Sequence, residues 1–188
     1  MMKVSNKLKP TIGFIGAGNM GLPMIKNLIK KGFQVKVYDI NPKITKKIEK
    51  HNIKTVNNLR AVANNQFIIS ILPDTQNVES VFNTDTGINS YLKPGTIVVD
   101  MSTISSSSAI EIGKNIKKKQ VEFLDAPVSG GVKGALNANL SIMVGGKKVI
   151  YKKSLDVLNS LGGKIIYAGK LGMGQVSKMC NQIKVGYH

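Results

Sequence analysis

A glycine-rich turn near the N-terminus reads Gly13-Phe14-Ile15-Gly16-Ala17-Gly18-Asn19-Met20-Gly21. A short apolar run of strand length leads into this turn, and residues 20–29 carry apolar side chains at helical spacing. In such a strand–turn–helix unit, the first glycine allows a tight turn, the second lets the backbone approach a pyrophosphate, and the third lets the helix pack on the strand. The free N–H groups at the helix start then face the anion. The motif therefore predicts a dinucleotide-binding turn.

An acidic residue follows this turn at a suitable distance. The next apolar run, residues 33–38, ends at Asp39. A carboxylate at the tip of a second strand accepts hydrogen bonds from the ribose hydroxyls of NAD and repels the extra phosphate of NADP. Three lysines between residues 43 and 47 could contact that phosphate, but no arginine follows closely. We expect NAD as the cofactor, with NADP possible. The alternative is a turn without a ligand, in which Asp39 only caps the next helix.

The bulk composition is that of a globular protein. The chain has 188 residues, of which 42% are hydrophobic, enough for one domain, or for one domain and the start of another. No apolar run reaches the length of a membrane span, and no Cys/His cluster suggests a metal site. The basic residues 1–10 lack the apolar core of a secretory signal. Cys180 is the only cysteine, which suits a reducing compartment. We expect a cytoplasmic protein, with the mitochondrial matrix as the other possibility.

The net charge of +17 raises the question of nucleic-acid binding. Of the 27 basic residues, only Arg60 is an arginine, whereas reading of bases and bidentate contact with phosphate favour arginine. The lysines are also spread along the whole chain. These features predict solvated lysine-rich faces and no specific nucleic-acid partner.

Strand and helix signals alternate along the chain, which predicts an α/β fold of the Rossmann type, with a doubly wound, mostly parallel sheet. Strands are expected near residues 11–16, 34–39, 53–56, 66–71, 96–100, 121–125, 139–144 and 164–167. Helices are expected near residues 20–31, 42–50, 58–63, 75–82, 105–118, 147–161 and from 173 onward.

This pattern divides the chain into three parts. Residues 1–10 form a basic lead, residues 11–170 an NAD(P)-binding Rossmann domain, and residues 171–188 the start of a helix that continues into another domain. The last helix carries apolar residues such as Met179 and Ile183 on one side, and the sequence stops about four turns after the helix begins. We therefore expect that the chain is truncated and that this side packs on a helical domain further along.

The segment Asp100-Met101-Ser102-Thr103 follows an expected strand. In a doubly wound sheet, ligands bind beyond the carboxyl ends of the strands, so the hydroxyl groups of Ser102 and Thr103 would face the cofactor or substrate. The alternative is that they only cap the helix expected at residues 105–118.

A loop of small residues follows Asp125 and runs to Ala135. Ser129, Gly130 and Gly131 offer a hydroxyl group and unobstructed backbone N–H groups, and such a nest can hold a carboxylate. The alternative is a plain glycine-rich turn.

The segment from Gly172 to Gln182 places Lys178 in the first turns of a helix. Asn181 and Gln182 follow at i+3 and i+4, so an amine and an amide share one helix face. An ammonium group there could donate a proton to a carbonyl oxygen as hydride arrives, while the amide orients that oxygen. The alternative is a solvated lysine on an amphipathic helix.

The glycine turn, the Asp125–Gly131 segment and Gly172-x-Gly174-x-x-x-Lys178-x-x-Asn181 occur here in one chain and in this order. Together they resemble the β-hydroxyacid dehydrogenase family, which includes 3-hydroxyisobutyrate dehydrogenase and tartronate semialdehyde reductase. The similarity covers nearly the whole chain.

The resemblance implies a role for each matching residue. The turn, with Asn19 and Met20, would bind the pyrophosphate. Leu72 and Pro73 would line the cofactor channel, and Thr103 would contact the nicotinamide side. Ser129, Gly130 and Gly131 would bind the substrate carboxylate, and Lys178 would be the general acid/base.

Two positions depart from the family pattern. Many relatives carry two asparagines where this chain has Asn181-Gln182, which leaves open which of the two supports the substrate. Relatives commonly have glycine at the position of Ala138, so we expect a small shift of that loop.

The family has a C-terminal helical domain that covers the active site and forms much of the dimer. The resemblance implies a homo-oligomeric enzyme that passes hydride between NAD(P) and the alcohol carbon of a small hydroxy acid such as 3-hydroxyisobutyrate. The alternatives are a relative of 6-phosphogluconate dehydrogenase, a non-catalytic dinucleotide-binding module, and an inactive truncated product.

Overall fold

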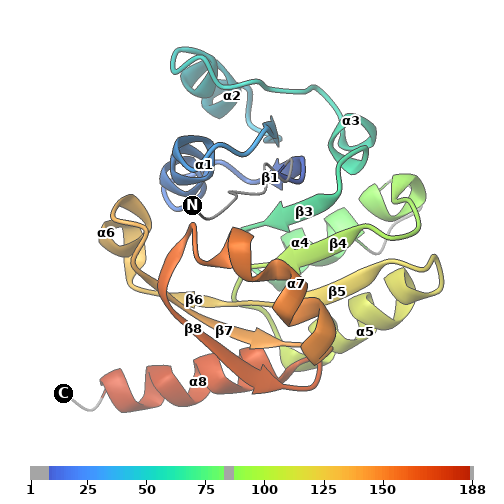
Figure 1. The fold of residues 1–188 in the computed structure, drawn as a ribbon, viewed down its shortest axis with the longest axis vertical. Helices are drawn as coiled ribbons and strands as arrows, with labels where there is room; N and C mark the ends of the chain where they lie inside the picture. Colours follow the sequence, from blue (N-terminus) through green and yellow to red (C-terminus); the bar gives the residue numbers. More distant parts are fainter. Residues whose placement is uncertain (1–8, 83–86, 187–188) are drawn as a thin grey trace, which may run out of the picture.

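A single twisted sheet with helices on both faces forms the protein (Figure 1). The computed structural model describes residues 9–82 and 87–186. The strands are β1 (Ile12–Ile15), β2 (Val35–Tyr38), β3 (Phe67–Ser70), β4 (Ile97–Asp100), β5 (Glu122–Asp125), β6 (Val128–Ser129), β7 (Leu140–Gly145) and β8 (Gly162–Gly169). The helices are α1 (Gly21–Lys30), α2 (Pro42–Glu49), α3 (Leu59–Ala63), α4 (Thr75–Phe82), the 3-10 helix η1 (Ile88–Tyr91), α5 (Ser106–Lys117), α6 (Gly131–Leu136), α7 (Lys148–Leu158) and α8 (Met173–Gly186).

The strand order confirms the expected doubly wound, mostly parallel sheet. The order is β2-β1-β3-β4-β5-β7, and both β6 and β8 pair with β7. Strands β1 to β5 pair in parallel, β7 is antiparallel to β5, and β8 is parallel to β7. Because β2 and β3 lie on opposite sides of β1, the direction of winding reverses at β1. A crevice opens at such a reversal, beyond the carboxyl ends of the strands.

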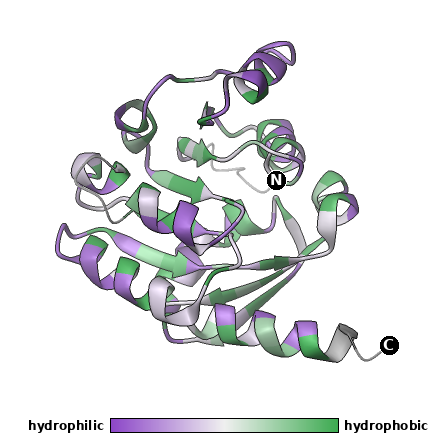
Figure 2. Cartoon of the chain, turned by 180° about the vertical axis from the view of Figure 1, so that it is seen from behind, coloured by the Kyte–Doolittle hydropathy of each residue, from purple (hydrophilic) through white to green (hydrophobic). Residues whose placement is uncertain are grey.

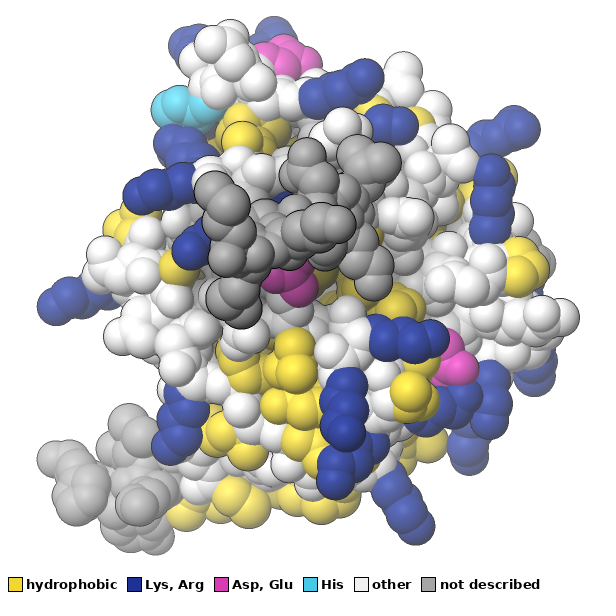
Figure 3. Space-filling model, viewed as in Figure 1, with side chains coloured by type: hydrophobic (Ala, Val, Ile, Leu, Met, Phe, Trp, Pro, Cys, Tyr) yellow, Lys and Arg dark blue, Asp and Glu magenta, His cyan; other side chains and the backbone are white. Residues whose placement is uncertain are grey.

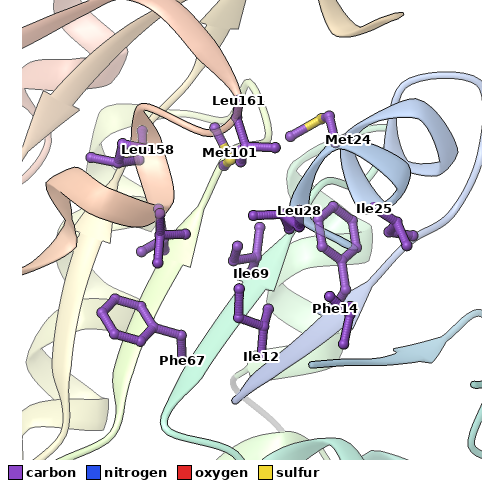
Figure 4. Packing of buried hydrophobic residues seen from close by; sticks show 14 of the residues in the cluster. Ile12, Phe14, Met24, Ile25, Leu28, Phe67, Ile69, Met101, Leu158 and Leu161 are labelled. Atoms are coloured by element: carbon purple, nitrogen blue, oxygen red, sulfur yellow. The ribbon is translucent and has the colours of Figure 1, made fainter. Parts of the chain in front are cut away.

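Both faces of the sheet are buried at the central strands β1, β3 and β4, which explains why these strands read as continuous apolar runs. Successive side chains of a strand point to opposite faces, so Ile12 and Phe14 join one buried cluster and Ile15 joins another. The first cluster includes side chains of α1 and α7, and the second includes side chains of α3, α4 and α5. Figure 4 shows the first cluster, where Phe14 lies beside Leu28 of α1.

Two sequence-based expectations are wrong in detail. Residues 53–56 form no strand, and only Thr55 makes a single parallel bridge, to Val37. That segment is apolar because Ile53 packs in the core, although it does not pair with a neighbouring strand. The loop expected after Asp125 contains β6 and α6. Of the basic lead expected at residues 1–10, residues 1–8 lie outside the described residues, as do residues 187 and 188 of the last segment.

The position where we expected a shifted loop is the end of α6. Ala138 has a φ of +51°, in the left-handed region that favours glycine. Its N–H still closes the turn by donating to the carbonyl oxygen of Ala135. The chain therefore keeps a glycine-type turn at this position although it carries alanine.

Helix α8 lies along the edge of the sheet and projects beyond it (Figure 1). Its burial is inverted relative to an ordinary surface helix, because polar side chains are buried and apolar ones are exposed. Gln175 and Lys178 are 4% and 8% exposed, whereas Met179 and Ile183 are each 57% exposed. Figure 2 shows the apolar residues on the projecting helix. This helix is therefore held by polar contacts at its N-terminal end.

Candidate functional site

The glycine turn connects β1 to α1 and leaves its backbone accessible. Gly16 has a φ of +89°, and a Cβ atom there would collide with the carbonyl oxygen of Ile71. A Cβ atom on Gly21 would collide with the carbonyl oxygen of Gly16, so this glycine permits the close approach of helix and turn. At Gly18, by contrast, a Cβ atom would meet nothing within 4 Å. The turn thus presents open backbone at its middle glycine, as contact with a pyrophosphate requires.

Asp39 follows the end of β2 and is tied to this turn. Its Oδ2 atom accepts a hydrogen bond from the Ala17 N–H at 2.8 Å, and Oδ1 accepts from the Asn41 N–H at 2.8 Å. Asn41 caps α2 by accepting from the Lys43 N–H. Asp39 therefore braces the turn and the start of α2 together. The carboxylate is only partly buried, and each oxygen can accept a further hydrogen bond.

A pocket of about 490 Å³ opens at the crevice beside β1. It is lined by the turn, by Asp39 and by the segment after β3, and it includes all the expected cofactor-binding residues except Thr103: Gly16, Gly18, Asn19, Met20, Gly21, Asp39, Leu72 and Pro73. Ile40, Ile44 and Leu59 add an apolar wall near Asp39. An anion-accepting turn, a carboxylate and apolar walls in one pocket fit a dinucleotide.

Ser129 and Asn181 come together from segments far apart in the sequence. Ser129 ends β6, and Gly130 and Gly131 follow with φ values of +125° and +57°. The Asn181 Nδ2 atom of α8 donates to the Ser129 Oγ atom at 3.4 Å. Gln182 is exposed and forms no side-chain hydrogen bond with any described residue. Of the two amides, the structure places Asn181 beside the serine.

Lys178 lies one turn before Asn181 with a buried side chain. No described residue forms a hydrogen bond or an ion pair with its ammonium group. Desolvation lowers the pKa of Lys178 from its ordinary value. An amine with a lowered pKa exchanges protons more readily at neutral pH, which suits a general acid/base.

Asp125, the last residue of β5, anchors the start of α8. Its Oδ1 atom accepts from the Gly172 N–H at 2.7 Å, and Oδ2 accepts from the Gln175 N–H at 3.0 Å. Burial raises the pKa of Asp125 to about 6, although these backbone donors oppose the rise. Cβ atoms on Gly145 or Gly174 would collide with this carboxylate. Sequence reasoning placed Asp125 only at the head of a loop and missed its role in anchoring α8.

A second buried carboxylate, Asp100, ends the neighbouring strand β4 in register with Asp125. Its Oδ1 atom accepts from the hydroxyl groups of Ser70 and Ser102, at 2.8 and 2.7 Å. Desolvation raises the pKa of Asp100 to about 6. Ser102 is thus directed inward, while Thr103 is exposed and lies outside the lining of the pocket.

Within residues 9–82 and 87–186, no group of three or more His, Cys, Asp or Glu residues could hold a metal ion. No helix in these ranges is long and apolar enough to cross a membrane. Basic side chains lie along the top and both sides of the face seen in Figure 3, and hydrophobic side chains lie along its lower edge.

The fold, the glycine turn and the pocket define a dinucleotide-binding domain of the Rossmann type. The chain belongs to the family described as the NAD binding domain of 6-phosphogluconate dehydrogenase, which it matches over residues 11–169. Its cofactor is accordingly of the NAD(P) class.

Several known proteins are similar to this chain over most of its length. The chain is 38% identical to mouse mitochondrial 3-hydroxyisobutyrate dehydrogenase over 176 residues, which cover 93% of this chain and 52% of that protein. It is also 38% identical to 2-(hydroxymethyl)glutarate dehydrogenase of Eubacterium barkeri, covering 93% of this chain and 58% of that protein. The structure of Mycobacterium tuberculosis 3-hydroxyisobutyrate dehydrogenase with L-serine superposes with a TM-score of 0.89 at 36% identity, covering 95% and 60% of the two chains. The chain spans about half the length of the curated relatives it matches.

Proposed function

We propose that this chain is the cofactor-binding half of an NAD(P)-dependent 3-hydroxyacid dehydrogenase. The enzyme would interconvert the alcohol and the carbonyl form of a small hydroxy acid such as 3-hydroxyisobutyrate. The observation that carries the proposal is Lys178, a buried amine without a carboxylate partner among the described residues. It lies on a helix that Asp125 anchors at the carboxyl edge of the sheet, the edge that also carries the glycine turn.

The residues of the pocket would hold the cofactor, which when bound supplies or accepts the hydride. Backbone N–H groups around Gly18 face the pyrophosphate, and Asp39 accepts hydrogen bonds from the ribose hydroxyls. Leu72 and Pro73 form an apolar wall of the pocket. An apolar wall excludes water from the cofactor, which favours hydride chemistry.

The substrate would bind between β6 and α8. The Ser129 hydroxyl group and the N–H groups of Gly130 and Gly131 hold the carboxylate of the hydroxy acid. The Lys178 ammonium group donates its proton to the carbonyl oxygen during reduction and takes it back from the hydroxyl group during oxidation. Asn181 supports this arrangement by holding the Ser129 hydroxyl group in place.

Replacement of the lysine tests the proposal directly. In the full product of the gene, Lys178→Ala should lower turnover by at least a hundredfold, because general acid/base groups contribute about 10²–10⁴-fold. Binding of the cofactor, measured by calorimetry, should stay within about twofold. The matched control is Lys170→Ala, an exposed lysine in the turn before α8. Activity of Lys178→Ala within tenfold of the wild type would disprove the assignment.

The preference for NAD over NADP rests on Asp39. Its carboxylate would repel the additional phosphate of NADP. We expect calorimetry to show at least tenfold tighter binding of NAD, and Asp39→Ser to narrow that difference. Equal affinities in the wild type would show that Asp39 does not select the cofactor.

A relative of 6-phosphogluconate dehydrogenase is the second candidate, because the matched family takes its description from that enzyme. Such an enzyme needs further cationic groups for a sugar phosphate, and Arg60 is the only arginine of this chain. Parallel assays with 6-phosphogluconate and 3-hydroxyisobutyrate separate the two activities. Cofactor binding without turnover of either substrate would favour the non-catalytic module.

The proposal extends to the location of the protein in the cell and to its assembly. The single cysteine favours the cytoplasm, while the names of the mouse, rat and human relatives point to mitochondria. Fractionation of cells that express a tagged protein decides between these compartments. We also propose a homo-oligomer, which sedimentation of the full gene product tests.

A further inference from the structure

The side-chain amide of Gln175 bridges the two neighbours of Thr103. Its Nε2 atom donates to the carbonyl oxygen of Ser102 at 2.9 Å, and its Oε1 atom accepts from the Ile104 N–H at 3.1 Å. Gln175 is almost fully buried, so water cannot readily replace either bond. The amide acts on this loop as a neighbouring strand would, by pairing with one carbonyl and one N–H group.

The backbone of Gln175 is held at the same time. Its N–H donates to Asp125, which also accepts from the Gly172 N–H. Asp125 ends β5, a strand in the middle of the sheet. One residue of α8 therefore joins the loop after β4 to the end of β5.

The bridge continues to the cofactor pocket through Ser102. The Ser102 Oγ atom accepts from the Leu72 N–H at 2.9 Å and donates to Asp100. Leu72 lines the pocket. A continuous set of hydrogen bonds thus leads from the pocket wall to α8.

We infer that Gln175 is a positioning residue, which holds the Thr103 loop against α8 and thereby fixes the cofactor wall relative to Lys178. Gln175 lies three residues before Lys178, so both project from the same side of the helix. Displacing Thr103 from α8 would break both hydrogen bonds of the amide. The roles of Thr103 and Lys178 in this inference rest on the proposed function, whereas the bridge itself does not.

The substitution Gln175→Met tests the bridge, because methionine has a similar volume and offers neither strong donor nor strong acceptor. Hydrogen exchange followed by NMR should show the Ile104 amide exchanging at least tenfold faster than in the wild type. Titration of the Lys178 side chain should show its pKa rising toward the ordinary value, because a loosened helix admits water. A role in stability alone would lower the melting temperature without moving that titration.

Two further variants keep the result interpretable. Gln76→Met, at an exposed position of α4, makes the same replacement outside the bridge and should match the wild type in both measurements. Gln175→Glu keeps the acceptor for Ile104 but loses the donor for Ser102, so it should protect the Ile104 amide better than Gln175→Met does.

An Ile104 amide and a Lys178 titration that stay unchanged in Gln175→Met would overturn the inference. If the methionine variant does not fold, Gln175→Ala, which removes both hydrogen bonds of the side chain, replaces it, and unchanged values in that variant would overturn the inference. None of these measurements uses cofactor or substrate. A wild-type protein that binds no dinucleotide would therefore refute the proposed function and leave the bridge to be judged by its own results.

Discussion

Helices α1 and α8 both begin at glycine-containing turns beyond the sheet, yet they attach to the molecule in opposite ways. Helix α1 buries Met24, Ile25 and Leu28 completely. Helix α8 buries Gln175 and Lys178 and exposes Met173, Met179 and Ile183. Burial of apolar surface stabilises the first helix, whereas a small number of hydrogen bonds at one end hold the second. The comparison separates a helix that stabilises the fold from a helix that presents chemical groups.

The largest difference between the two helices should appear on truncation of an apolar side chain. Leu28→Ala in α1 should lower the free energy of unfolding by about 2–5 kcal/mol, because it leaves a cavity in the core. Ile183→Ala in α8 should change it by less than about 0.5 kcal/mol, because that side chain is mostly exposed. Denaturant unfolding of both variants measures these values. Similar losses in the two variants would contradict the comparison.

The polar attachment of α8 should also make stability depend on pH, through the buried carboxylates. Asp100, whose pKa is about 6, holds Ser102, which accepts from Gln175 of α8. Because this pKa is raised above the unfolded value near 3.8, the folded state binds more protons between pH 4 and 6. The protonation of Asp100 contributes fully to the free energy of unfolding below pH 4, and this contribution is lost as the pH rises to 6. The free energy of unfolding should therefore fall by about 3 kcal/mol over this range.

The substitution Asp100→Asn removes this titration. The decrease in the free energy of unfolding between pH 4 and 6 should therefore be smaller in the variant than in the wild type by up to that amount. Denaturant unfolding at several pH values measures the free energy of unfolding of both proteins. The effects of the other titrating groups cancel when the two pH profiles are subtracted. Parallel pH profiles would show that Asp100 does not carry the proton.

A matched pair of glycines gives the third test. Cβ atoms on Gly21 and Gly174 would both collide with backbone oxygen atoms, and neither glycine has a positive φ. Alanine at either position should destabilise the protein by roughly 1–3 kcal/mol through overpacking. Gly21→Ala should also abolish NAD binding, while Gly174→Ala should retain it, because only Gly21 belongs to the pocket. Calorimetry measures NAD binding by both variants. Loss of NAD binding in both would contradict the expectation that only Gly21 contributes to the pocket.

The fold was largely predictable because its signals are local. The glycine turn and the runs that became β1, β3 and β4 each combine an apolar period with clear boundaries. Strand β6 and helix α6 were missed because two and six residues are too short to show a period. Residues 53–56 have the composition of a strand, but tertiary packing of Ile53 replaces strand pairing there.

The candidate site was predictable only in its residue types. A lysine, a serine and an asparagine could be selected from the sequence, but the contact between Asn181 and Ser129 spans 52 residues. The bridge formed by Gln175 spans more than 70 residues, and nothing near Gln175 in the sequence indicates its partners. A useful local signal was present in Asp100 and Asp125, since each carboxylate directly ends an apolar strand and is buried.

The anchor of α8 also limits how this sequence can change over evolutionary time. The Asp125 carboxylate, together with backbone atoms around it, fills the space that side chains on Gly145 and Gly174 would occupy. Enlarging either glycine first would displace the carboxylate, and shortening Asp125 first would leave the N–H groups of Gly172 and Gln175 without their acceptor. Every single-step path thus passes through an impaired intermediate. We expect these three positions, which belong to three different segments of the chain, to be inherited as a unit.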